Sequence, residues 1–125
     1  MKIVNVKKYR GDYVYCGRSG YGKVGCVLHN PFSHEPKAKA IQVKDRDAAI
    51  EAFRVYLWAA LHNAATVQIE DVGSVRIQIN RLQVLAFLKT LDEESVLGCY
   101  CSPLRCHCEV IASCWEWLKR TNQLD

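Results

Sequence analysis

Four of the seven cysteines and one of the four histidines lie in the segment CYCSPLRCHCEV, residues 99–110. Thiols and an imidazole at this density can bind a soft metal ion, supply a nucleophile, or pack as small apolar side chains. The segment follows an apolar run and precedes a stretch with helical periodicity, so we expect it to form the bend between a strand and a helix. Ligands of α/β proteins bind at such junctions, which favours a site here.

A nucleophilic interpretation assigns the attacking thiol to Cys106 or Cys101, with His107 and Glu109 as acid–base partners. The partial positive charge at the start of a helix lowers the pKa of a nearby thiol and favours its thiolate form. Adjacent residues of a helix point about 100° apart, so we do not expect Cys106 and His107 to face each other directly. One of the two would face a pocket while the other packs.

A zinc interpretation uses the same segment, because Zn²⁺ prefers four thiolate or imidazole ligands in a tetrahedron. Cys99, Cys101, Cys106 and His107 would supply four ligands, with Cys108 as a fifth candidate. The usual zinc knuckle, however, has two residues between paired cysteines, and the sequence contains no second pair of this kind. We therefore expect no cofactor and keep zinc as the alternative.

Burial is the third interpretation, since free cysteine is among the most buried residue types. It is our first expectation for Cys99, Cys108 and Cys114, and we expect Cys16 and Cys26 to fill the core. The cysteine count is odd, and the amino terminus alternates charged and apolar residues without the apolar stretch of a signal peptide or a membrane span. We therefore expect reduced thiols, no membrane partner and a cytoplasmic location.

The rest of the chain predicts an α/β fold in one domain, residues 1–125, with a mixed, mostly parallel sheet flanked by helices. Residues 17–36 hold four of the seven glycines and two of the three prolines, which predicts a long loop. In the last helix, Ser102 would be the N-cap and Pro103 would lie in the first turn. The expected elements are strands at 2–7, 13–16 and 95–101, helices at 45–62, 81–91 and 104–118, and a β-hairpin insertion at about 66–80.

The formal net charge of +4 arises from 17 basic and 13 acidic residues in a chain of 125. A balance of this size is typical of a mildly basic protein surface and tolerates a phosphorylated ligand. It does not favour nucleic acid as a partner. The apolar hairpin offers an edge strand for a homodimer, or it extends the sheet of a monomer.

Three stretches resemble the domain of unknown function 4326 family of small bacterial, archaeal and phage proteins. They are VYCGR at 14–18, NPF at 30–32 and CYCSPLRCHCEVI at 99–111, and AIEAFRVYL at 49–57 lies between them. The similarity spans most of the chain and implies a prokaryotic or phage-infected host cell. It also implies that one pocket is ringed by Gly17, Arg18, Asn30, Pro31, Phe32, Cys99, Cys101, Pro103, Cys106 and His107.

The sequence departs from the family pattern at several positions. His29 replaces a loop glycine, Cys108 replaces the glycine after His107, and Glu109 replaces an aspartate while keeping the carboxylate. Residues 66–80 have the character of an insertion. The two lost glycines remove positions at which the backbone could approach a ligand closely.

Such a pocket would combine backbone amides, a guanidinium, an amide, an aromatic wall and the start of a helix, which suits an anionic, ring-bearing molecule. We expect a nucleotide- or nucleoside-derived ligand, and leave open whether Cys/His chemistry processes it. The alternatives are a zinc-stabilised module that contacts protein or nucleic acid and a phage-type protein that sequesters a signalling nucleotide without turnover. The expected ligand-binding residues are Gly17, Arg18, Asn30, Pro31, Phe32 and Ser102.

Overall fold

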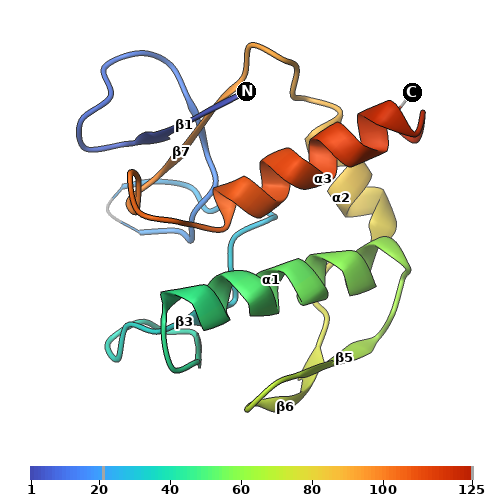
Figure 1. Ribbon diagram of the computed structural model, residues 1–125. Helices are drawn as coiled ribbons and strands as arrows, with labels where there is room; N and C mark the ends of the chain where they lie inside the picture. Colours follow the sequence, from blue (N-terminus) through green and yellow to red (C-terminus); the bar gives the residue numbers. More distant parts are fainter. Residues whose placement is uncertain (21, 125) are drawn as a thin grey trace.

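A computed structural model describes residues 1–20 and 22–124 of the chain (Figure 1). Three helices and seven short strands alternate along it. In chain order the elements are β1 (Lys2–Asn5), β2 (Val14–Tyr15), β3 (Phe32–Ser33), β4 (Ile41–Gln42), α1 (Arg46–Leu61), β5 (Thr66–Ile69), β6 (Gly73–Arg76), α2 (Arg81–Leu88), β7 (Val96–Cys99) and α3 (Cys108–Arg120).

The largest sheet has the order β1-β7-β2, and all three strands are parallel. In this sheet Leu97 of β7 lies between Ile3 and Val14 and is fully buried. Strands β3 and β4 form a second parallel pair, and β5 and β6 form an antiparallel hairpin. The predicted α/β class, the mostly parallel strands and the hairpin are therefore confirmed. The hairpin makes a separate sheet instead of extending the main one.

Helix α1 is the central packing element. Its amino terminus is capped by Asp45, whose carboxylate accepts a hydrogen bond of 2.8 Å from the amide of Ala48. Its apolar face buries Phe53 and Leu57, and it contacts α2, α3, β3 and β5. In Figure 1, α1 and α3 run side by side in the same direction, so both helices start at the same end of the molecule.

The hairpin and α2 pack on the other end of α1. The hydroxyl of Tyr56 accepts a 2.9 Å hydrogen bond from the amide of Gln78, which ties the segment after β6 to the helix. Ile69, Val75 and Leu88 are buried there against the helices. Figure 1 shows this hairpin on the side of α1 away from β1 and β7.

The last helix starts later than the sequence predicts. Ser102 and Pro103 lie in a turn with a cis peptide bond, and α3 begins at Cys108, with His107 at the N-cap position. The turn has its own backbone partners: Leu104 donates to the carbonyl of Cys101 at 2.8 Å, and the carbonyl of Ser102 accepts from Nδ2 of Asn5 at 2.9 Å. The expected N-cap role of Ser102 is therefore wrong.

Residues 17–36, which we call the glycine-rich loop, contain turns, bends and β3 but no helix in their described part. Across residues 1–20 and 22–124, no helix is both long and apolar enough to cross a membrane.

Candidate functional site

The glycine-rich loop and residues 99–107, which we call the cysteine bend, line one pocket of about 740 Å³. Tyr15 and Cys99 end two of the parallel strands, and Lys7 follows the end of the third. The pocket therefore opens at the carboxyl ends of the sheet, where α/β proteins bind their ligands. The predicted site residues among its walls are Gly17, Arg18, Asn30, Phe32, Cys99, Cys101, Cys106 and His107.

Asn30 uses its side chain to hold the loop in place. Its Nδ2 donates to the carbonyl of Ala49 in α1 at 3.1 Å, and its Oδ1 accepts from the amide of Phe32 at 2.9 Å. Arg18 adds a second tie, because its Nη1 donates to the carbonyl of Asn30 at 2.8 Å. Both side chains face the pocket, yet their observed partners belong to the protein backbone.

Phe32 forms part of the pocket floor and is 1% exposed. Its ring packs edge-on against Tyr56, with 6.0 Å between centroids. Pro31 and Ser102 are not among the described pocket walls. The carbonyl of Pro31 accepts from the amide of Ile41 beside the β3–β4 pair, and that of Ser102 accepts from Asn5. Pro31 and Ser102 thus hold the loop and the bend through their backbone.

His107 is buried, and its Nε2 lies 2.6 Å from the carbonyl oxygen of Cys16. A carbonyl only accepts, so Nε2 carries the proton and donates it. Burial lowers the pKa of His107, which keeps the ring neutral. The edge of Phe53 packs against the ring, with 5.1 Å between centroids. The imidazole thus ties the end of β2 to the start of α3.

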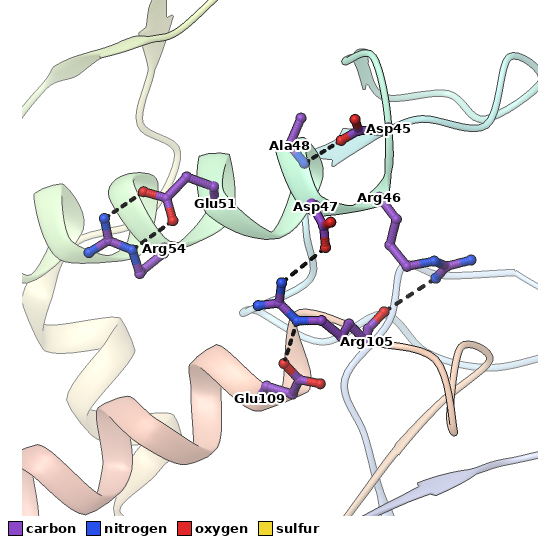
Figure 2. Close-up of polar contacts among 8 residues, drawn as sticks. All are labelled: Asp45, Arg46, Asp47, Ala48, Glu51, Arg54, Arg105 and Glu109. Carbon is purple, nitrogen blue, oxygen red and sulfur yellow. Dashed lines mark hydrogen bonds and ion pairs between the residues drawn. The ribbon is translucent and has the colours of Figure 1, made fainter.

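Glu109 lies outside the described pocket walls, on the exposed side of α3. Its carboxylate accepts from Nε of Arg105 at 3.2 Å, and Nη1 of Arg105 reaches Asp47 of α1 at 2.9 Å. Figure 2 shows Arg105 between these two carboxylates, with Arg46 donating to its carbonyl oxygen. The structure does not bring Glu109 to His107, so Cys106, His107 and Glu109 form no relay.

The thiols form a connected group. All seven cysteines are free, and the Sγ atoms of Cys99, Cys106 and Cys108 lie within 4.8 Å of one another in buried positions. Cys99 and Cys106 are in contact, with 3.1 Å between their sulfurs. The expected burial of Cys99, Cys108, Cys16 and Cys26 is confirmed, whereas Cys114 is only partly buried.

Hydrogen bonds among the thiols shift their pKa values in opposite directions. Cys101 donates to Cys99, and this lowers the pKa of Cys99 to about 7 despite its burial. Cys108 is the main donor to Cys106, which lowers the pKa of the Cys106 thiol. The pKa of Cys101 and that of Cys108 are raised, because each of these thiols must keep its proton to donate it to the neighbouring sulfur. Lowered and raised pKa values thus alternate between neighbouring thiols of the cluster.

The charged side chains of the pocket are mostly basic. Lys7, Arg18, Arg46 and Arg105 line it, against the single carboxylate of Glu35 among the described walls. In residues 1–20 and 22–124, Arg46 has no carboxylate partner. Its Nη1 donates instead to the carbonyl of Arg105 at 3.3 Å. The helix starts of α1 and α3 add positive partial charge at the same end.

Sequence reasoning missed Lys7, Arg46 and Glu35 as pocket residues. Two of them carried a positional signal. Lys7 is the last residue of a predicted strand, and Arg46 follows the N-cap Asp45 at the start of α1. Ligands gather at both kinds of position. Glu35 lies in the irregular loop and has no such signal.

These features define a small α/β protein with a basic, thiol-lined pocket at the carboxyl ends of a parallel sheet. The family model described as "Domain of unknown function (DUF4326)" matches residues 4–117, and the chain belongs to this family. The resemblance seen in the sequence is thereby confirmed. No curated protein and no solved structure matches the chain.

Proposed function

We propose that the protein binds a small, anionic, ring-bearing molecule of the nucleotide or nucleoside-derivative class in this pocket. The observation that carries the proposal is the charge of the walls. Lys7, Arg18 and Arg46 line the pocket without an ion pair among the described residues, and Glu35 is the one carboxylate among the described walls. The volume of about 740 Å³ falls within the range of small-molecule sites. An anion entering this pocket would replace solvent around cations that the protein has already brought together.

Arg46 is the best-placed contact for the anionic group. It is the first residue of α1, where the opening turn carries positive partial charge, and its side chain lines the pocket. Its observed bond to the carbonyl of Arg105 is 3.3 Å long and leaves other N–H groups of the guanidinium for a ligand. Lys7 lies across the pocket, with its Nζ 5.7 Å from the ring centroid of Tyr100.

The aromatic walls suit the ring of the ligand. Tyr15 and Tyr100 line the pocket and pack edge-on, with 6.1 Å between centroids. The hydroxyl of Tyr15 donates to the carbonyl of Arg18 at 2.7 Å, which fixes the ring against the glycine-rich loop. A planar base could pack on these rings while its anionic group reaches the start of α1.

The geometry favours binding over turnover. His107 donates from Nε2 to a backbone carbonyl, and the carboxylate of Glu109 is paired with Arg105 outside the pocket. Neither side chain is therefore placed as the acid–base partner that the nucleophilic interpretation assigned to it. We therefore assign the protein the role of a binder that holds its ligand intact, as a sequestering or sensing protein would. Its cytoplasmic location remains a prediction.

Calorimetric titration with four nucleoside monophosphates, their nucleosides and inorganic phosphate tests the proposal. At least one nucleotide should bind more tightly than both its nucleoside and phosphate. Arg46→Gln should weaken that binding by about tenfold or more, because a charge-assisted hydrogen bond contributes about 1.5–3 kcal/mol. The matched control is Arg54→Gln on the same helix. The guanidinium of Arg54 pairs with Glu51 at a distance of 2.6 Å, and Arg54 does not line the pocket.

Chromatography of the same mixtures after incubation reports whether the nucleotide stays intact. Intact ligand supports a binder, and conversion that depends on Cys106 would overturn that part of the proposal. The absence of binding by every nucleotide would overturn the whole. Equal losses in Arg46→Gln and Arg54→Gln would do the same, because the effect would then not be local to the pocket.

A further inference from the structure

We propose that Cys99, Cys106 and Cys108 form a binding site for a thiophilic metal ion, Zn²⁺ in the first place. The site lies where β7 ends and α3 begins. We call the three sulfur atoms of these residues the sulfur triangle. This triangle differs from the ligand set that the sequence suggested, because Cys108 takes the place of His107 and Cys101 lies outside it. The inference does not depend on the proposed nucleotide binding.

The distances fit a metal with small adjustments. Zinc–sulfur bonds of about 2.3 Å in a tetrahedron place the sulfurs about 3.8 Å apart. The three Sγ atoms lie within 4.8 Å of one another, and Cys99 and Cys106 are 3.1 Å apart. Side-chain rotations that move each sulfur by less than about 1 Å would reach the tetrahedral spacing. No rearrangement of β7 or α3 is needed.

His107 is not available as a ligand through Nε2. That nitrogen is committed to the carbonyl of Cys16 at 2.6 Å, and the ring is packed against Phe53. Loss of this bond would leave a buried carbonyl without its partner. The imidazole therefore supports the bend that carries the cysteines and leaves the metal to the thiols.

The chemistry of the three thiols also favours a cation. They are 4% exposed or less, and a buried thiolate needs a compensating charge. A divalent ion would bind all three sulfurs at once and displace their protons to solvent.

The open coordination position would face the pocket. Cys99 and Cys106 line the pocket, whereas Cys108 is fully buried behind them. A metal bound by all three thus has protein on one side and the pocket on the other. Cys101 contacts Cys99 and also lines the pocket, so its thiol or a water molecule would complete the tetrahedron.

The test is a titration of the full-length, reduced, metal-free protein with Co²⁺ under anaerobic conditions, followed by displacement with Zn²⁺. We expect one Co²⁺ per chain, with the thiolate charge-transfer absorption and intense d–d bands of a four-coordinate site, and loss of these bands on adding Zn²⁺. Zinc retained by protein purified without chelator should reach the same ratio in elemental analysis.

Serine variants test the ligands one by one. Cys99→Ser, Cys106→Ser and Cys108→Ser should each weaken Co²⁺ binding by more than about tenfold, since even partners of metal ligands contribute that much. Cys114→Ser is the matched control, because it lies on the same helix outside the triangle. Cys101→Ser should keep one metal per chain, since three thiolates remain.

Circular dichroism checks that each variant is folded, and the wild-type titration stays informative even where one is not. Folded, fully reduced wild-type protein that binds neither Co²⁺ nor Zn²⁺ would overturn the proposal. So would binding that survives all three substitutions, or that Cys114→Ser removes as well.

Discussion

The segments that pack at the two ends of α1 are held in place by different kinds of contact. At the pocket end, side chains tie irregular backbone in place: Asn30 donates to the carbonyl of Ala49, and Asn5 donates to that of Ser102. At the hairpin end, Tyr56 accepts one such bond from Gln78, and apolar packing buries Ile69 and Leu88. Polar ties fix a loop at a few points and leave a hollow beside it, whereas apolar packing fills space.

This difference predicts that stability and ligand binding depend on different parts of the molecule. A change in the apolar hairpin end should lower the free energy of unfolding and leave the pocket intact. A change at one of the polar ties should reshape the pocket for a smaller loss of stability.

Leu88→Ala removes a fully buried side chain of α2. We expect the free energy of unfolding to fall by about 2–5 kcal/mol, because the substitution leaves a cavity in a packed core. Urea unfolding measures the loss, and calorimetry at low temperature should give an unchanged nucleotide affinity. A weakened affinity in the folded variant would show that the two ends are coupled.

Asn30→Ala removes two hydrogen bonds that hold the glycine-rich loop, one to Ala49 and one from Phe32. We expect a loss of about 1–3 kcal/mol in the free energy of unfolding, because the carbonyl of Ala49 and the amide of Phe32 lose their partners. Nucleotide binding should be abolished, since the loop forms a wall of the pocket. Full affinity in this variant would contradict the role of Asn30 as a tie.

The helix caps Asp45 and Asn80 form a matched pair at the two ends. Each side chain accepts from a backbone amide in the first turn, at 2.8 Å for Asp45 and 3.0 Å for Asn80. Alanine at either position should lower the free energy of unfolding by about 1 kcal/mol. Only Asp45→Ala should weaken nucleotide binding, because Arg46 follows it. Equal affinities in the two variants would argue against a contact at the start of α1.

Glu35→Gln removes the one carboxylate among the described pocket walls. The side chain is about two-thirds exposed, so solvent screens its charge. We expect nucleotide affinity to rise by about two- to fivefold, with no change in thermal stability. A weaker affinity would mean that the carboxylate contacts the ligand directly, as an acceptor for the base or the sugar.

Cys114 lies on α3, as Cys108 does, but its sulfur does not belong to the cluster of Cys99, Cys106 and Cys108. Burial raises the pKa of the Cys114 thiol to about 11, so about one molecule in ten thousand carries the thiolate at pH 7. Its alkylation by iodoacetamide should rise about tenfold per pH unit up to that pKa. Peptide mass spectrometry follows the site, and a rate independent of pH would contradict the assignment.

The hairpin end could be predicted from the sequence because its signals are local. The capping box of Asn80 and Gln83 and the alternation on both sides of residues 71–74 lie within a few residues of the elements that they define. The N-cap at Asp45, at the other end of α1, is a local signal of the same kind. These signals place α1, α2 and the hairpin to within a few residues. Tertiary contacts add stability there without changing the local structure.

The pocket end depends on contacts between distant residues. The bend stays out of α3 partly because Asn5, 97 residues away, donates to the carbonyl of Ser102. Helical spacing predicts that Cys108 is buried, but its approach to within 4.8 Å of Cys99 and Cys106 depends on the path of the bend, which spacing does not indicate. The resemblance to the family brought Arg18, Asn30 and His107 to one site, but not the use of their side chains as ties.

The most direct test of the account is an ¹H–¹⁵N correlation spectrum of the protein titrated with the nucleotide that binds most tightly. We expect shifts in the amide signals of the non-proline residues in the ranges 17–20, 30–35, 46–50 and 99–107, with those of residues 66–91 unchanged. Shifts confined to residues 66–91, or no shift with any nucleoside monophosphate at saturating concentration, would contradict it.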